Sequence, residues 1–265
     1  MSFQFINPGT NKAPILLSIP HCGVEFPEEL KGLYNSSLIH APDDTDWFVD
    51  QLYDFSSELG ISMISARYSR WVIDLNRDPE SKPLYDDGRI ITQLCPTHSF
   101  AGQELYRNGY VPTKEDITKR LSKYYEPYYQ KIDEELRNLK NEFGYVIFWD
   151  AHSIRQYVPL IRQERFPDLI LGDNDGKSAN TNLSKIAFNQ LRRRGHQINY
   201  NEPFKGGHLT RYFGRPETNQ HALQLEMTKI NYMNHSETDY DPQRAVRIRD
   251  SLALVFEQLL KSLDK

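Results

Sequence analysis

The sequence predicts an α/β fold, a single domain whose mainly parallel or mixed central sheet is flanked by helices on both faces. Amphipathic segments end in glycine directly before β-forming runs at Gly60, Gly144 and Gly195. Strands that alternate with helices in this way form parallel sheets covered on both sides. No change of composition marks a linker, and 265 residues are enough for one large core. We therefore expect one domain over residues 1–265.

The individual elements follow from local patterns. A proline-bounded apolar run at 14–20 predicts a short buried strand, and the acidic cluster at 43–46 offers N-caps for a helix. Thr113 and Asp116 form a capping-box variant that begins a long helix, which Pro127 kinks or divides. The expected strands are 14–20, 61–66, 71–75, 90–94, 145–149, 167–171, 197–200 and 221–227, and the expected helices are 43–59, 113–143, 182–194 and 242–263.

Composition narrows the class of protein. The formal net charge of −4 and the pI near 6.1 predict neither nucleic acid nor an anionic membrane as partner. Two cysteines cannot make a disulfide framework, which favours a reducing compartment. The first ten residues lack signal-peptide features, and no run of about 18 apolar residues occurs. We expect a cytoplasmic protein.

Two histidines each follow a predicted buried strand, His21 after residues 14–20 and His152 after residues 145–149. The carboxyl ends of parallel strands meet at one edge of a sheet, where α/β proteins build their sites. Two neutral imidazoles with one carboxylate and an open position are the usual ligands of a catalytic Zn²⁺. The alternative is that each histidine is structural.

Several acids are candidates for the carboxylate ligand. Asp44 and Asp46 lie at a predicted helix start, where N-capping is the competing interpretation, and Glu25 lies near His21. Asp150 is two residues before His152 and therefore on the same face of the strand, so it could orient that ligand. Cys22 is a further thiol candidate.

Glu226 lies within the apolar run 221–227. A buried glutamate is costly unless it is paired, so one interpretation is a salt-bridged core residue. The functional interpretation is a general base of raised pKa beside a metal-bound water.

Four arginines lie near the predicted strand ends: Arg70, Arg77, Arg155 and Arg211. Each alone is more often a solvated surface residue, but convergent guanidiniums bind carboxylates in bidentate fashion. This predicts a small acidic substrate. A Gly-x-Ser-x-Gly elbow and Gly-rich phosphate loops are absent, which argues against a serine hydrolase and a nucleotide-binding fold. The tyrosine-rich run at 124–129 is interpreted as helix packing.

Six blocks together resemble N-formylglutamate amidohydrolases, over about residues 14–235. The blocks are SIPHCG at 18–23, DTDW at 44–47, YSRWVIDLNR at 68–77, WDAHSIR at 149–155, FKGGHLTR at 204–211 and LQLEM at 223–227. The resemblance implies metal-dependent hydrolysis of N-formyl-L-glutamate to L-glutamate and formate, in histidine degradation. It also implies a fold similar to zinc carboxypeptidases and aspartoacylase, with one Zn²⁺, or another divalent metal, per chain.

The same resemblance implies roles for individual residues. His21 and His152 would be metal ligands, Glu226 the base, and Arg70 the group that polarises the scissile carbonyl. Asn76 with Arg77 would hold a substrate carboxylate.

The carboxylate ligand departs from the wider fold, because Val24 occupies the position three after His21 where that fold has Glu. The order of preference is Asp44, then Asp46, then Glu25.

Two further positions differ from relatives: Phe48 replaces a common His, and Asp173 replaces a usual Thr. Asp173 would add negative charge if it faced the substrate. The alternatives are a related N-acyl-amino-acid amidohydrolase, a carboxypeptidase-like enzyme, or a non-catalytic protein that binds acidic ligands.

Overall fold

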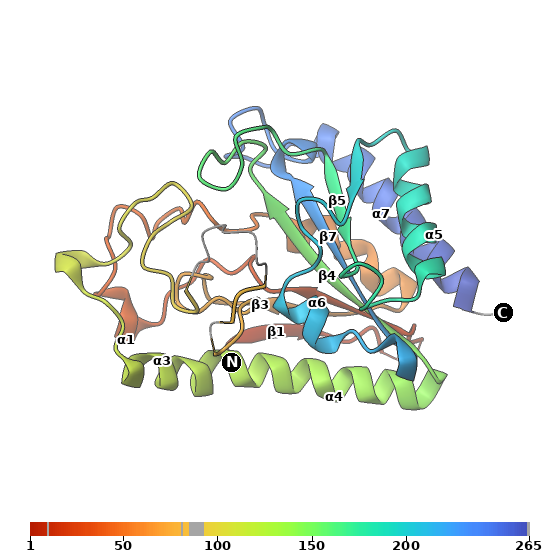
Figure 1. The fold of residues 1–265 in the computed structure, drawn as a ribbon, viewed down its shortest axis with the longest axis horizontal. Helices are drawn as coiled ribbons and strands as arrows, with labels where there is room; N and C mark the ends of the chain where they lie inside the picture. Colours follow the sequence, from red (N-terminus) through yellow and green to blue (C-terminus); the bar gives the residue numbers. More distant parts are fainter. Residues whose placement is uncertain (10, 81, 85–92, 264–265) are drawn as a thin grey trace.

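The computed structural model describes residues 1–9, 11–80, 82–84 and 93–263. Within these residues seven strands form one sheet in the order β1-β3-β2-β4-β7-β5-β6, between two layers of helices (Figure 1). The strands are β1 (Phe3–Ile6), β2 (Ile15–Ile19), β3 (Ser62–Ala66), β4 (Val146–Ile154), β5 (Leu169–Gly172), β6 (Ile198–Tyr200) and β7 (Gln220–Thr228). The helices are α1 (Glu28–Lys31), α2 (Val49–Leu52), α3 (Lys114–Arg120), α4 (Glu126–Phe143), α5 (Thr181–Arg193), α6 (His208–Phe213) and α7 (Pro242–Leu263). The expected α/β class and mixed sheet are confirmed.

The centre of the sheet is parallel. β2 pairs in parallel with β3 and β4, and β4 pairs in parallel with β7. The outer strands differ, since β1 is antiparallel to β3 and β5 is antiparallel to β7. The carboxyl ends of β2, β3, β4 and β7 therefore meet at one edge of the sheet.

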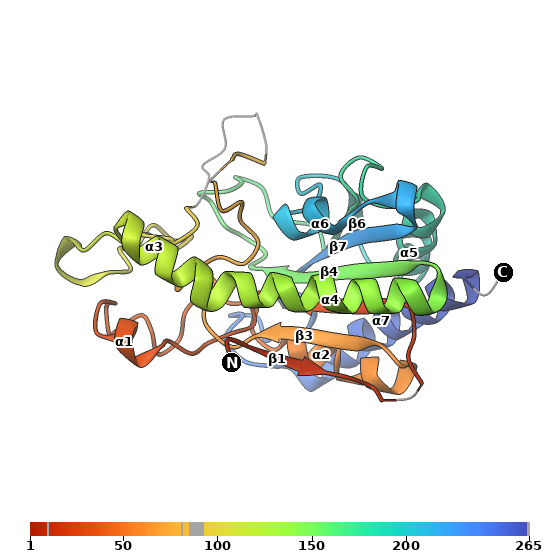
Figure 2. The same ribbon diagram turned by 90° about the horizontal axis from the view of Figure 1, so that it is seen from below.

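Each face of the sheet has its own helices (Figures 1 and 2). Helices α2, α5 and α7 pack on one face, and α4 with α6 on the other. Because side chains alternate along a strand, neighbouring residues of β4 face opposite layers. Trp149 contacts Phe256 of α7, whereas Phe148 contacts Phe213 of α6. Asp150 and His152 lie on the same face as Phe148 toward the carboxyl end of β4, where Asp150 accepts a hydrogen bond from Thr210 of α6 at 3.0 Å.

The long helix predicted at 113–143 is present as two segments. Thr113 and Asp116 form the expected capping box at the start of α3. A π-helical turn, Leu121–Tyr125, separates α3 from α4, and Pro127 lies in the first turn of α4. Proline has no N–H to donate, so it is tolerated there. Gly144 adopts a left-handed conformation (φ 79°) and ends α4, as predicted.

Other predictions were wrong or incomplete. Residues 71–75 lie in turns and irregular backbone instead of a strand. The helix expected at 43–59 is only α2 and a 3₁₀ helix at Asp54–Leu59, because Phe48 has a positive φ of 63° that no α-helix continues through. The short elements β1, α1 and α6 were not anticipated. Most of the strand expected at 90–94 lies outside the described residues.

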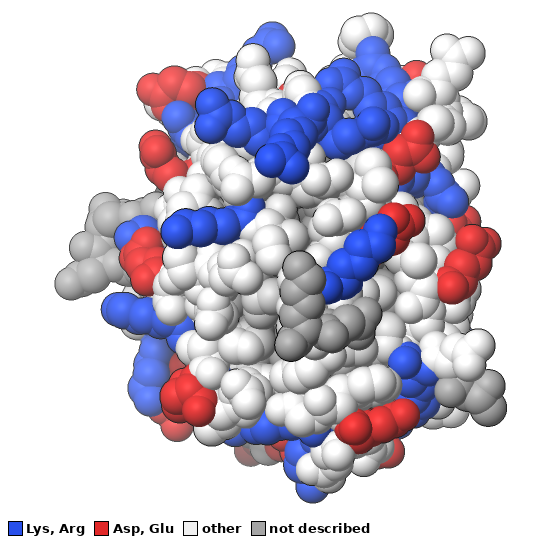
Figure 3. All heavy atoms as spheres, turned by 90° about the vertical axis from the view of Figure 1, so that its right-hand side faces the viewer, with Lys and Arg blue, Asp and Glu red and all other residues white. Residues whose placement is uncertain are grey.

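Figure 3 looks onto the side of α5, α7 and the C-terminus and shows Lys and Arg side chains gathered along one edge of that face. The last turn of α5 carries the exposed Arg192 and Arg193, and Arg247 of α7 donates to the carbonyls of Arg194 and Gly195. Cations at a helix C-terminus are favourable, which gives these arginines a structural explanation.

No helix in the described part of the chain is both long and apolar enough to cross a membrane.

Candidate functional site

A cavity of about 680 Å³ opens at the carboxyl edge of the sheet. Its walls include six of the side chains predicted to form the site: His21, Arg70, Asn76, Arg77, His152 and Glu226. They come from the loops after β2 and β3 and from β4 and β7. The structure thus brings four distant stretches of the sequence to one place.

Three buried side chains at the base of the cavity form a compact group. The ligand atoms of His21, Asp46 and His152 all lie within 4.8 Å of one another. Nδ1 of His152 is 3.3 Å from Oδ2 of Asp46, and Nδ1 of His21 is 3.7 Å from the same oxygen. Both imidazoles therefore turn Nδ1 toward one carboxylate.

The opposite nitrogen of each ring faces a second carboxylate. Nε2 of His21 is 2.7 Å from Oδ1 of Asp74, and Nε2 of His152 is 3.0 Å from Oδ1 of Asp150. Carboxylates in this position fix the orientation of histidines that bind metal. Asp150 is thus placed for the orienting role considered for it from the sequence.

The chemistry of this group fits a divalent metal. Among the described residues, Nδ1 of His21 and Oδ1 of Asp46 are buried without a hydrogen-bond partner. Such atoms are costly to bury unless something satisfies them. Burial, helped by Arg70, lowers the pKa of His21 to about 4, so its imidazole is neutral. Burial would also lower the pKa of His152, but the carboxylates of Asp150 and Asp46 outweigh it and hold that pKa well above its ordinary value. His21, Asp46 and His152 together supply the two imidazoles and one carboxylate of a catalytic zinc site.

Asp44, the first choice from the sequence, does not join this group. Its carboxylate accepts hydrogen bonds from Nε1 of Trp71 (2.7 Å) and from the backbone N–H of Phe100 (3.0 and 3.1 Å). Glu25 is exposed and paired with Arg67 at 2.8 Å. Asp46 therefore replaces Asp44 in the candidate ligand set, because the carboxylate of Asp44 is bonded to Trp71 and Phe100 and does not belong to the His21–Asp46–His152 group.

Glu226 on β7 lies beside His152, its register partner on β4. Burial raises the pKa of Glu226 to about 8; Asp46 and Asp150 add to this effect, whereas His152 and Arg70 oppose it. A carboxyl group of this kind can exchange a proton near neutral pH.

Arg70 and Arg77 give the cavity positive charge. Nη2 of Arg70 is 2.6 Å from Oδ2 of Asp74, and its guanidinium lies 4.9 Å from the ring centre of Phe100. Nε of Arg77 is 3.6 Å from the same Asp74 oxygen. Burial would raise the pKa of Asp74, but Arg70, His21 and Arg77 outweigh it and hold that pKa well below its ordinary value. Asp74 therefore remains an anion between two cations and a histidine.

Asn76 lines the cavity, but both ends of its amide have protein partners. Nδ2 is 3.0 Å from Nε2 of His152, and Oδ1 accepts from the N–H of Leu209 at 2.8 Å. A Cβ at Gly207 would lie 2.2 Å from Nδ2 of Asn76, so only glycine fits against this amide. The structure thus places Asn76 against His152, in addition to facing the cavity.

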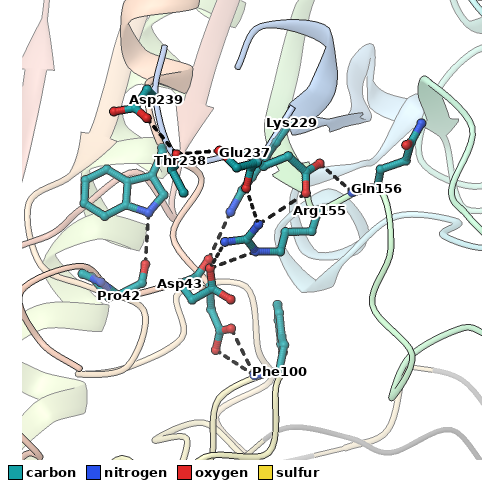
Figure 4. A network of polar contacts seen from close by, with 12 residues as sticks. Pro42, Asp43, Phe100, Arg155, Gln156, Lys229, Glu237, Thr238 and Asp239 are labelled. Atoms are coloured by element: carbon teal, nitrogen blue, oxygen red, sulfur yellow. Dashed lines mark hydrogen bonds and ion pairs between the residues drawn. The ribbon is translucent and has the colours of Figure 1, made fainter. Parts of the chain in front are cut away.

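Arg155 and Arg211 are not among the described residues that line this cavity. Arg155 pairs with Asp43 and Glu237 and donates to the carbonyl of Ser236 (Figure 4). Arg211 donates to the carbonyls of Gly206 (2.9 Å) and Leu84 (2.7 Å). The expected convergence of four arginines is therefore reduced to Arg70 and Arg77.

Three other positions singled out in the sequence are not among the described residues that line the cavity. Phe48 packs against Trp47 and Tyr240. Asp173 is fully buried and bonded to the protein, so it adds no charge to the cavity. Burial raises the pKa of the Cys22 thiol well above its usual value, which disfavours the thiolate that a metal needs.

Two residues of the site were missed. Asp74 belongs to the Asp-Leu-Asn-Arg stretch at 74–77. Its position between Arg70 and Arg77 in the sequence could have indicated an ion-paired aspartate at the site. Gln224 lies two residues before Glu226 and accepts from the N–H of Gly207 at 2.6 Å. Its period-2 spacing from Glu226 could have indicated that it faces the same side.

Comparisons with known proteins agree with this architecture. The chain is 41% identical over 258 residues to a protein of Pseudomonas aeruginosa named N-formylglutamate deformylase, which covers 95% of this chain and 93% of that protein. It is 36% identical over 257 residues to a protein of the same name from Pseudomonas putida, covering 95% and 92%.

A solved structure also shares the fold. The crystal structure of N-formylglutamate amidohydrolase from Ralstonia eutropha JMP134 superposes with a TM-score of 0.80 at 23% identity, covering 99% of this chain and 97% of that one. The family model described as N-formylglutamate amidohydrolase matches residues 13–233. The chain therefore belongs to the N-formylglutamate amidohydrolase family.

Proposed function

We propose that this protein hydrolyses N-formyl-L-glutamate to L-glutamate and formate with the help of one divalent metal ion, expected to be Zn²⁺. The two relatives that are 41% and 36% identical carry the name of this activity. The observation that carries the proposal is the position of Glu226 beside the buried His21–Asp46–His152 group, in a cavity that Arg70 and Arg77 also line.

His21, Asp46 and His152 are the residues proposed to hold the metal. When bound, a divalent ion supplies a Lewis acid and lowers the pKa of a water molecule. Asp74 and Asp150 keep the two imidazoles in orientation from behind.

The chain's own groups manage the proton and the charge. The carboxylate of Glu226 accepts a proton from the water that attacks the formyl carbon. Arg70 faces the cavity and stabilises the negative charge that develops on the formyl oxygen. Glu226 then delivers the proton to the amide nitrogen, the C–N bond breaks, and formate and the free amine of glutamate leave.

Arg77 is the proposed contact for a substrate carboxylate. Its side chain lines the cavity and is partly exposed, so it can turn a guanidinium edge toward an anion. A contact between Arg77 and the substrate carboxylate orients the formamide for attack.

A substrate panel tests the proposal. Release of the acyl group from N-formyl-L-glutamate, N-formyl-L-aspartate and N-acetyl-L-aspartate is measured with purified, zinc-supplemented protein. We expect the highest kcat/KM with N-formyl-L-glutamate. A higher kcat/KM with N-acetyl-L-aspartate would mean that the substrate is another N-acyl amino acid. No turnover of any of the three compounds would favour a non-catalytic protein that binds acidic ligands.

A further inference from the structure

The segment at 70–77 carries Arg70, Asp74, Asn76 and Arg77 without belonging to the sheet. Its main-chain groups consequently have no strand ladder to bond with, although they are buried and need partners. Few backbone bonds hold it, for example from Asp74 N to the carbonyl of Leu94 at 2.7 Å. The position of these site residues must depend on other contacts.

Side chains from outside the segment donate to its carbonyls. The hydroxyl of Tyr34 donates to Trp71 at 2.9 Å, and Nη1 of Arg120 donates to Val72 at 3.0 Å. Two further bonds come from the tyrosine-rich run at 124–129. The hydroxyl of Tyr129 donates to the carbonyl of Leu75, and that of Tyr125 to the carbonyl of Arg77, both at 2.8 Å.

Tyr125 and Tyr129 are built as a rigid pair. They are four residues apart, so they lie on the same side of the helix. Both are buried, and their rings stack with centroids 4.2 Å apart and an angle of 13° between the planes. Phe213 of α6 packs against Tyr129, 5.6 Å between ring centres. This packing restrains both rings and therefore the positions of both hydroxyls.

The two carbonyls flank Asn76. The carbonyl of Leu75 belongs to the peptide group before Asn76, and the carbonyl of Arg77 belongs to the peptide group after Arg77. The two hydroxyls therefore hold the main chain at both ends of the Asn76–Arg77 pair, in which the Asn76 side chain contacts His152. The adjacent Arg77 is the proposed contact for the substrate carboxylate. The tyrosine pair is thus hydrogen-bonded to the main chain that carries Asn76 and Arg77, but it does not line the cavity itself.

We propose that Tyr125 and Tyr129 are positioning residues that fix Asn76 and Arg77 in the cavity through hydrogen bonds to the carbonyls of Leu75 and Arg77. This inference rests on the proposed function for its kinetic consequences. It also gives the tyrosine-rich run a role beyond helix packing.

The same run supplies matched controls. The hydroxyl of Tyr124 bonds Glu29 (2.8 Å), and the hydroxyl of Tyr128 lies 2.9 Å from Oγ of Ser18 on β2. Neither contacts the segment at 70–77 through its hydroxyl in the described residues. Tyr128 and Tyr129 are both buried, so Tyr128→Phe and Tyr129→Phe each remove a buried hydroxyl. They differ in the partner that the hydroxyl bonds, which is Ser18 for Tyr128 and the carbonyl of Leu75 for Tyr129.

Four single variants, Tyr124→Phe, Tyr125→Phe, Tyr128→Phe and Tyr129→Phe, are compared for kcat, KM and thermal midpoint. We expect Tyr125→Phe and Tyr129→Phe each to lower kcat/KM on the order of tenfold, below the roughly 100-fold cost of a displacement of about 1 Å. Tyr124→Phe and Tyr128→Phe should leave kcat/KM nearly unchanged, because their hydroxyls bond Glu29 and Ser18 and not the segment at 70–77. Equal kcat/KM losses for Tyr128→Phe and Tyr129→Phe would overturn the proposal.

A double-mutant cycle separates positioning from general stability. If Tyr125 acts through Arg77, the effect of Tyr125→Phe on kcat/KM largely disappears in an Arg77→Ala background. An unchanged effect in both backgrounds would overturn this route.

Crystal structures of the four variants decide the inference independently of turnover. Residues 75–77 should shift in Tyr125→Phe and Tyr129→Phe and stay in place in the two controls. If the wild-type protein does not hydrolyse N-formyl-L-glutamate, the proposed function fails alone. An unmoved segment in Tyr125→Phe and Tyr129→Phe overturns the positioning role whatever the activity.

Discussion

Asp44 and Asp46 are two positions apart, yet they have different partners and therefore different chemistry. Asp44 accepts hydrogen bonds from Trp71 and Phe100, which uses its oxygens to hold two loops together. Asp46 faces two imidazoles and keeps one oxygen without a partner in the described residues. From the sequence, each could be a helix cap or a metal ligand. Only the three-dimensional structure shows which of the two faces the histidines.

Zinc binding should distinguish these two aspartates. Loss of an orienting residue behind a ligand costs about 10- to 100-fold in metal affinity, so Asp46→Asn, which removes a proposed ligand, should cost more than about 100-fold. Asp44→Asn should bind zinc nearly as the wild type does. Competition titration with a chromophoric chelator measures both constants. The opposite order, with Asp44→Asn weak and Asp46→Asn intact, would return the ligand role to Asp44.

Glu226 should matter for turnover and not for metal content. Glu226→Gln keeps the size of the side chain but removes its ability to accept the proton, so kcat should fall by about 10²–10⁴-fold. Zinc content, measured by atomic emission, should remain that of the wild type. A variant with near wild-type kcat would show that another group is the base.

At the scale of elements, the sequence predicted those with a strong periodic pattern and clear ends. The glycine after α4 and the capping box before α3 were correct because both act locally. The strand predicted at 71–75 was wrong, because a short buried apolar stretch has the same pattern whether it forms a strand or a turn. Its actual conformation depends on tyrosines and an arginine that lie far away in the sequence.

Asp173 joins the end of β5 to α5 and β6. Its carboxylate accepts from Ser184 Oγ (2.6 Å), Asn201 Nδ2 (2.9 Å), the N–H of Gly176 (2.9 Å) and the hydroxyl of Tyr200. Burial would raise the pKa of Asp173, but these hydrogen bonds outweigh it and lower the pKa. Asp173→Asn should therefore reduce the free energy of unfolding at pH 7 by about 1.5–3 kcal/mol, as for hydrogen bonds to a charged group.

The pH dependence of this difference has a definite sign. A carboxyl whose pKa is lower in the folded state contributes stability above its unfolded pKa of about 3.9, and loses it as the pH falls through the folded value. Urea unfolding of the wild type and Asp173→Asn should give a constant difference near neutral pH that shrinks below about pH 4. A difference that grows on acidification would mean that burial, and not hydrogen bonding, dominates.

At the scale of the whole molecule, parallel strands explain why the sequence located the site. His21 follows β2, while His152 and Glu226 lie at the same end of β4 and β7, so all three reach one edge once the strands run in parallel. The partners of side chains in the loops could not be predicted in the same way. Arg155 pairs with Asp43, 112 positions earlier, and no local pattern reveals that partner. The predicted likeness to zinc exopeptidases, the cytoplasmic location and the absence of a nucleic-acid partner stay predictions.

In the proposed mechanism, hydrolysis of N-formyl-L-glutamate depends on a metal held by His21, Asp46 and His152. The most direct measurement is kcat/KM for this substrate on one preparation as purified, after chelation with verified metal removal, and after Zn²⁺ is added back. The proposed mechanism predicts that activity disappears with the metal and returns with about one equivalent per chain, the stoichiometry of a single catalytic site. Unchanged kcat/KM in the metal-free protein would contradict it.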